Sequence, residues 1–146
     1  MKSLKYCLFL MGACMLMSTN LYADNETSGT PVKKTRSETF IYAKEKAWEP
    51  AGEGVKRQVL GYDGQVMVVK VKFEKGAVGT PHTHYHTQTT YVASGKFEFT
   101  VGGEKKIVEA GDGIYMEPDV LHGCVCLEEG MLIDCFSPMR ADYLKK

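Results

Sequence analysis

The sequence predicts an all-β protein, closed as a barrel or as a double-sheet jelly roll. From about residue 40 onward, short apolar stretches alternate with turns that contain glycine, a pattern typical of strands and hairpins. Short strands in this number commonly close on themselves or form two packed sheets. The one helical turn that we expect lies in the last residues, 140–146.

The expected strands follow one another through the domain. Their sequences are QVMVVKVKF (65–73), TTYVASG (89–95), KFEFTV (96–101), KKIVEA (105–110), GIYME (113–117), HGCVCL (122–127) and MLIDCF (131–136). The clearest hairpin turns at Gly102-Gly103, because glycine accepts the positive φ angles of a two-residue turn. Before this turn Phe97, Phe99 and Val101 alternate with polar residues, which predicts one buried and one solvated face.

Length and charge set limits on the function. The 146 residues, 44% hydrophobic and 25% charged, suit a single globular domain. Lysine plus arginine and aspartate plus glutamate number 18 each, so no net charge draws the protein to nucleic acid or to an acidic membrane. The expected partner is a small molecule.

The N-terminal residues follow the pattern of a signal peptide. Lys2 and Lys5 precede an apolar run, 6–17, which is shorter than the roughly 20 residues that span a bilayer. We expect a signal peptide over 1–23 with cleavage after Ala23; the alternative is a lipoprotein anchored through Cys14. In either case the protein is exported, with the periplasm as the expected location. A flexible leader (24–38) and one domain (39–146) follow.

The cysteines do not suggest a disulfide framework. Cys7 and Cys14 fall in the signal segment, which leaves an odd number, three, in the domain. Cys124 and Cys126 lie two apart on one expected strand, where neighbouring residues on one face rarely have disulfide geometry. We expect them to face inward as small core residues.

Three of the four histidines stand at alternating positions. On an extended chain His82, His84 and His86 project to one side, with Gln88 next on that side. A barrel can bring the fourth, His122, opposite them. Three imidazole nitrogens and one oxygen suit a divalent first-row metal ion with positions left open for a substrate. The alternative for His86 is a packing role where the strand bends.

A second group of polar residues lies near the C-terminus. By the period of two, Asp134 and Phe136 point into the interior while Ile133 and Cys135 point out. A buried carboxylate fits beside a cation or a proton in transfer; alternatively, it pairs with Arg140 as a structural salt bridge. The planar guanidinium of Arg140 suits a substrate carboxylate, unless it is a surface residue on a tail.

The histidine segment resembles the first cupin motif, G-x5-H-x-H-x3,4-E-x6-G. Residues 76–95 follow its spacing throughout, and the one departure is Gln88 in place of the glutamate. The second cupin motif is matched more loosely, by Gly111, Pro118 and His122. The resemblance implies a single-domain cupin, a double-stranded β-helix of the jelly-roll type.

Residues 74–104 and 110–144 are similar to the small single-domain cupins of pectin and alginate breakdown, the KdgF-like proteins. In that family two histidines, a glutamine and a third histidine hold the metal, which implies the ligands His82, His84, Gln88 and His122. The closing segment of the family implies a pocket lined by Asp134, Phe136 and Arg140. The resemblance implies a 4,5-unsaturated monouronate as substrate and a linear keto sugar acid as product.

The resemblance and the residues together give an expected mechanism. The metal is the electrophile, Asp134 transfers a proton, Arg140 holds the substrate carboxylate and Phe136 forms the pocket wall. A neutral amide at Gln88 leaves the ion its full charge, which favours an anionic substrate; alternatively, Gln88 only forms a hydrogen bond and water completes the shell.

Several features remain open at this stage. Nickel, zinc, iron, manganese and cobalt all suit the ligand set. A cupin dioxygenase and a non-catalytic sugar-acid-binding cupin are the alternative functions. A homodimer paired through sheet edges is the expected assembly.

Overall fold

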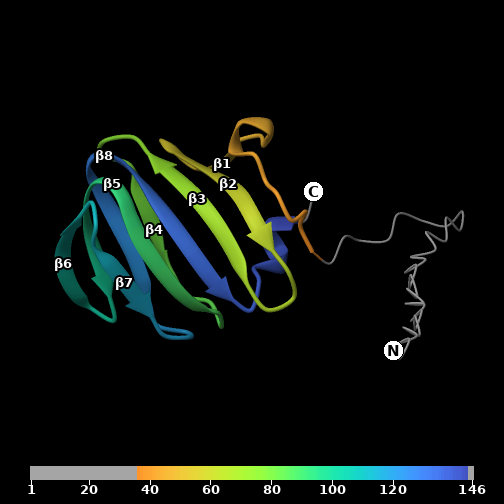
Figure 1. Ribbon diagram of the computed structural model, residues 1–146. Coiled ribbons are helices and arrows are strands. Elements are labelled where there is room, and N and C mark those ends of the chain that lie inside the picture. Colours follow the sequence, from red (N-terminus) through yellow and green to blue (C-terminus); the bar gives the residue numbers. More distant parts are fainter. Residues whose placement is uncertain (1–35, 145–146) are drawn as a thin grey trace, which may run out of the picture. The chain divides into compact units, whose positions relative to one another are not determined.

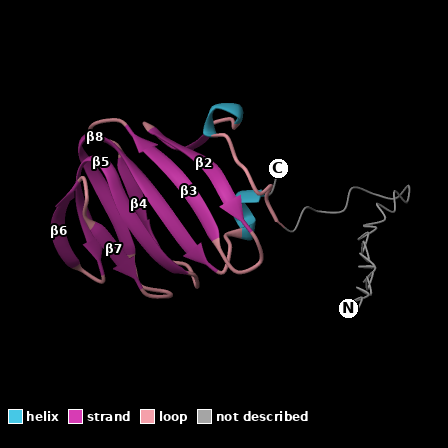
Figure 2. Cartoon of the chain, viewed as in Figure 1, coloured by secondary structure: helices cyan, strands magenta, loops and turns pink. Residues whose placement is uncertain are grey.

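The computed structural model describes residues 36–144. The predicted signal peptide, including Cys14, and residues 24–35 of the predicted leader lie outside the described residues. Within the described range the chain consists mainly of strands, with two short helical turns (Figure 2). No helix in this range has the length and apolar character needed to cross a membrane. The all-β prediction is confirmed.

The strands are labelled in Figure 1 in chain order. The 3-10 helical turns are η1 (Ala43–Glu45) and η2 (Ala141–Leu144). The strands are β1 (Glu49–Gly52), β2 (Val55–Tyr62), β3 (Met67–Phe73), β4 (Val78–His82), β5 (Thr87–Val101), β6 (Glu104–Glu109), β7 (Gly113–Met116) and β8 (His122–Ser137).

The two longest strands, β5 and β8, form the centre of the fold. They pair antiparallel from one end to the other, from Thr87 opposite Ser137 to Val101 opposite His122. At one end β3 continues the sheet beyond β8, followed by β2 and β1, and β7 pairs with β5. At the other end β4 pairs with β8 and β6 pairs with β5. Two antiparallel sheets therefore share one central ribbon, which is the jelly-roll arrangement.

The central ribbon bends where two glycines meet. Gly95 has φ +82°, and a Cβ at this position would lie 2.5 Å from the Cα of Gly130. Only glycine on both strands lets the backbones approach this closely. The sequence predicted separate strands on either side of these bends. In the structure the predicted strands 89–95 and 96–101 are both part of β5, and 122–127 and 131–136 are both part of β8, because the β5–β8 ladder resumes beyond the irregular register. Strands β1, β2 and β4 and the turn η1 were not predicted.

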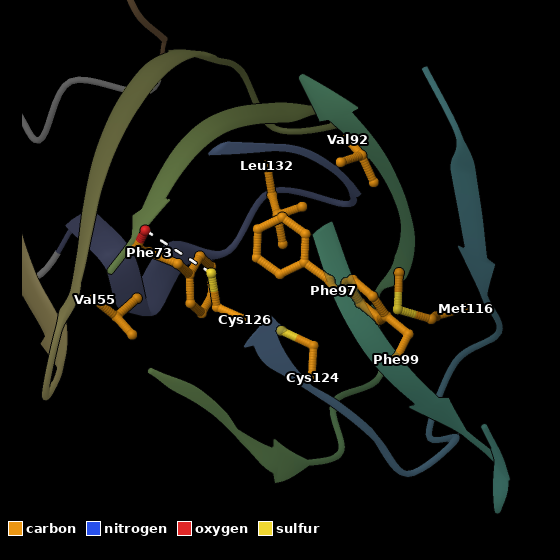
Figure 3. Close-up of a cluster of buried hydrophobic side chains, with 9 residues drawn as sticks. All are labelled: Val55, Phe73, Val92, Phe97, Phe99, Met116, Cys124, Cys126 and Leu132. Carbon is orange, nitrogen blue, oxygen red and sulfur yellow. Dashed lines mark hydrogen bonds between the residues drawn. The ribbon is translucent and has the colours of Figure 1, made fainter. Parts of the chain in front are cut away.

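A cluster of apolar side chains fills the space between the sheets (Figure 3). Its buried members are Val55, Phe73, Val92, Phe97, Phe99, Met116, Cys124, Cys126 and Leu132. The rings of Phe73 and Phe97 meet edge to face at 5.4 Å between centroids. Each large side chain stabilises the fold by about 1.5–3 kcal/mol through burial. Among the described residues the cysteines are free, as predicted.

Candidate metal centre

Three histidines converge in the interior, two from the neighbouring strands β4 and β8 and one from the loop after β4. His82 ends β4 and is the register partner of His122, which begins β8, while His84 lies in the loop after β4. One ring nitrogen from each lies within 4.8 Å of the other two. The ring centroids of His82 and His122 are 4.6 Å apart. The predicted convergence of these residues is therefore observed.

Backbone carbonyl groups fix the orientation of all three rings. The Nδ1 atom of each donates to a carbonyl oxygen: His82 to Thr80 at 2.8 Å, His84 to His86 at 3.1 Å and His122 to Val120 at 2.9 Å. A carbonyl can only accept, so Nδ1 carries the hydrogen. In the neutral ring Nε2 then holds a free lone pair, as metal-binding histidines require.

The surroundings favour the neutral form of His84 and of His122. Burial lowers the pKa of His84 and of His122, and the positive charge of Arg140 lowers both further. The Nε2 atom of His122 is buried and has no hydrogen-bond partner. An unpartnered buried nitrogen is costly, and a cation bound between the three rings would satisfy it. The donor set therefore fits a divalent transition metal ion.

Gln88 lies next to this cluster, as predicted. Its side chain is buried, and Oε1 lies 3.0 Å from Nε2 of His84. On its other side the amide nitrogen donates to Thr90 at 3.1 Å, and the Thr90 hydroxyl donates to Asp134 at 2.6 Å. A buried chain of hydrogen bonds thus runs from the histidines to the carboxyl group.

Asp134 and Phe136 point into the interior as predicted, while Cys135 is exposed. Burial raises the pKa of Asp134 to about 6, although hydrogen bonds from Thr90 and Gln88 and nearby positive charge act in the opposite direction. Phe136 packs edge-on against the ring of His84 at 5.7 Å. The interior therefore holds an acid that titrates near neutrality beside the histidines.

Arg140 is a largely buried residue and not a surface arginine on a tail. Its side chain is 12% exposed, and its guanidinium carbon lies 5.5 Å from the Phe136 ring centre. The Nε and Nη2 atoms donate to the two carboxylate oxygens of Asp142, so the alternative of a salt bridge to Asp134 is not observed. Nη1 is buried and is thus the part of the guanidinium fork without a protein partner.

His86 is buried near the cluster but is not part of it. It is 4% exposed, its ring stacks on Tyr85 at 3.9 Å, and neither ring nitrogen makes a hydrogen bond. Burial lowers its pKa, with a further contribution from Arg140. His86 therefore lies outside the converging set, and its ring packs on Tyr85.

Thr90 of the site, and Arg57 on the far side of Tyr143 from Arg140, were not singled out from the sequence. Thr90 shares the inward face of β5 with Gln88, so the period of two could have identified it. The guanidinium carbon of Arg57 lies 3.8 Å from the ring centre of Tyr143. The guanidinium carbon of Arg140 lies 4.5 Å from the same ring centre. No sequence pattern indicated Arg57, because β2 itself was not predicted.

The fold and the histidine cluster define a class of protein. The cupin domain family matches residues 69–133, and two bent antiparallel sheets with histidines converging inside are the expected architecture. The chain belongs to the cupin family.

Comparison with known proteins places the chain within this family. It is 49% identical over 102 residues to the pectin degradation protein KdgF of Dickeya dadantii (strain 3937), covering 68% of this chain and 93% of that protein. The structure of KdgF from Halomonas sp. matches with a TM-score of 0.70 and 38% identity, over 73% of this chain and 99% of that one. An RmlC-like cupin from Shewanella frigidimarina NCIMB 400 matches with a TM-score of 0.73 and 44% identity, over 75% and 98%.

Proposed function

We propose that this protein is a metal-dependent cupin that converts 4,5-unsaturated monouronates, released by pectin or alginate lyases, to linear keto sugar acids. One observation carries the proposal: His84 of the histidine cluster and Arg140 both lie against Phe136, and hydrogen bonds through Thr90 and Gln88 link the buried carboxyl of Asp134 to His84. The similarity to a pectin degradation protein supports the substrate class.

His82, His84, His122 and Gln88 would hold the metal ion, with nickel, zinc, iron and manganese all suited to the donor set. When bound, such an ion acts as a Lewis acid toward sugar oxygens. All four side chains are neutral as ligands, which leaves the ion its full charge and favours an anionic sugar acid.

The proposed reaction is an isomerisation. The anomeric hydroxyl loses its proton, the bond between C1 and the ring oxygen breaks, and C4 gains a proton as the enol becomes a ketone. The molecular formula is unchanged, so the protein has only protons to move. Asp134 suits this role, because an acid that titrates near neutrality can both give and take a proton.

The other residues would bind and orient the substrate. The edge of Arg140 formed by Nη1 and Nη2 would donate two hydrogen bonds to the substrate carboxylate. Phe136, 2% exposed, would form an apolar wall that excludes water from the reacting atoms. Asp142 keeps the guanidinium in place from behind.

The proposed location is the periplasm, reached through the predicted signal peptide or through a lipid on Cys14. Extracytoplasmic lyases would release the substrate there. The expected homodimer stays a prediction.

The test follows the ultraviolet absorbance of the conjugated double bond of unsaturated galacturonate. Metal-loaded protein should remove this absorbance faster than the spontaneous reaction, and a His82→Ala, His84→Ala double variant should not. Equal rates for both proteins would contradict the proposal. Oxygen consumption would instead indicate a dioxygenase, and binding without turnover a sugar-acid-binding cupin.

A further inference from the structure

A glutamine ligand differs from a glutamate ligand because only one of its two terminal groups can bind a cation. A carboxylate has two equivalent oxygens, and either can bind a cation. An amide has one oxygen and one NH2 group, and the NH2 group only donates. If the amide of Gln88 were turned over, a donor would face the lone pairs where the cation binds. The site therefore requires a hydrogen-bond partner that directs the oxygen of the Gln88 amide, and not its NH2 group, toward the cation.

The hydrogen bonds between β5 and β8 fix the orientation of the Gln88 amide. The hydroxyl of Thr90 has one hydrogen, which it donates to Oδ1 of Asp134 at 2.6 Å. Toward Gln88 the same oxygen can only accept, so the group that faces it at 3.1 Å is the NH2 group. The amide oxygen must then point the other way, toward His84 at 3.0 Å.

The orientation is set in a buried environment. Thr90 is 0% exposed, and Gln88 and Asp134 are both under 10% exposed, so water does not compete for these hydrogen bonds. At the far end Oε1 of Gln88 lies 3.0 Å from Nε2 of His84. With the hydrogen of His84 on Nδ1 both atoms are acceptors, and a cation that both bind would be favoured there.

We propose that Thr90 is a positioning residue of the metal centre, which makes Gln88 a ligand by holding its amide oxygen toward His84. Asp134 accepts the hydrogen bond of Thr90 and so fixes the other end of this series of hydrogen bonds. The inference rests on the metal centre of the proposed function and is independent of the sugar substrate.

The experiment measures the dissociation constant for Zn²⁺ by competition with a chromophoric chelator, without any turnover. Thr90→Val keeps the shape of the side chain and removes the hydroxyl; Thr90→Ser keeps the hydroxyl and is the matched control. Because loss of such an orienting partner typically costs about 10- to 100-fold in metal affinity, Thr90→Val should weaken binding by that amount. Thr90→Ser should bind nearly as the wild type does.

The same substitution in the Gln88→Glu variant separates the effect of Thr90 on amide orientation from its effect on packing. In Gln88→Glu the ligand has two equivalent oxygens, so adding Thr90→Val should change Zn²⁺ affinity by less than about threefold. An equal loss in both backgrounds, or no loss in either, would overturn the inference. If Thr90→Val does not fold, Thr90→Cys, a weak hydrogen-bonding group of similar size, replaces it. A protein that binds Zn²⁺ as expected but converts no uronate would contradict only the proposed function.

Discussion

The two ends of strand β5 are built alike but hold opposite chemistry. At one end Gln88 and Thr90 point inward, and at the other end Phe97 and Phe99 do; all four are buried. On the partner strand β8, Asp134 lies opposite Thr90 and Cys126 opposite Phe97, while His122 of the histidine cluster begins β8 opposite Val101. Strand alternation thus decides which residues are inside, and side-chain chemistry decides whether that interior stabilises the fold or binds a ligand.

The energetic consequences differ between the two ends. Apolar side chains gain from burial without needing partners, whereas each buried polar group costs free energy unless it is hydrogen-bonded. The Gln88–Thr90–Asp134 chain offsets part of this cost, and the raised pKa of Asp134 shows that part of it remains. The metal-free polar end is therefore less stable than an apolar core of the same size would be.

The largest effect should follow from removing a ligand. His122→Ala should abolish stoichiometric metal binding and reduce turnover by at least about 1,000-fold, because the remaining two rings leave an incomplete site. Metal analysis of the purified variant and the uronate assay would measure both. Full metal occupancy would contradict the assignment.

Removing an apolar side chain from the second half of β5 should affect stability instead. Phe97→Ala should lower the free energy of unfolding by about 3–5 kcal/mol, because Phe97 is fully buried and packs on Phe73. Urea unfolding of the metal-free protein would measure this loss, with the smaller change Phe97→Leu as control. Zn²⁺ affinity of the folded variant should stay close to the wild-type value. A parallel loss of metal affinity would show that the apolar cluster also positions His122, which begins the same half of β8.

A smaller, pH-dependent effect should come from Asp134→Asn in the presence of a chelator. The pKa of Asp134 rises from 3.8 to about 6 on folding, so the folded state holds the proton more tightly. Stability should therefore fall as the pH rises through this range. The variant avoids this loss, so at about pH 8 it should be more stable than the wild type by about 2–3 kcal/mol, and at about pH 4 nearly equal to it. Thermal unfolding at both pH values would check this; a stability gain of equal size at both would contradict it.

The smallest effect on the metal should come from His86→Phe. Neither nitrogen of His86 belongs to the converging set, so Zn²⁺ affinity should change by less than about twofold. The same chelator competition would measure it, with His84→Ala as the contrasting variant. A large loss of affinity would place His86 among the ligands.

The sequence allowed much of this arrangement to be predicted, for identifiable reasons. A period of two assigned Asp134 and Phe136 to the interior, and the Gly102-Gly103 turn fixed the β5–β6 hairpin. Strand β2 was missed, because its burial does not follow a clean alternation. The continuity of β5 and β8 through their glycines was missed as well, because a glycine in sequence predicts a turn as readily as a close approach of two backbones.

By itself the sequence determined the strand rhythm, the inward-facing sets and the cupin resemblance, because these depend on local alternation and on spacing along the chain. Tertiary structure alone decided the contacts that no pattern in the sequence indicated. It placed Asp142 on the fork of Arg140 and put Thr90 between Gln88 and Asp134. These contacts depend on register between strands far apart in sequence, and register is set by the packing of the whole sheet.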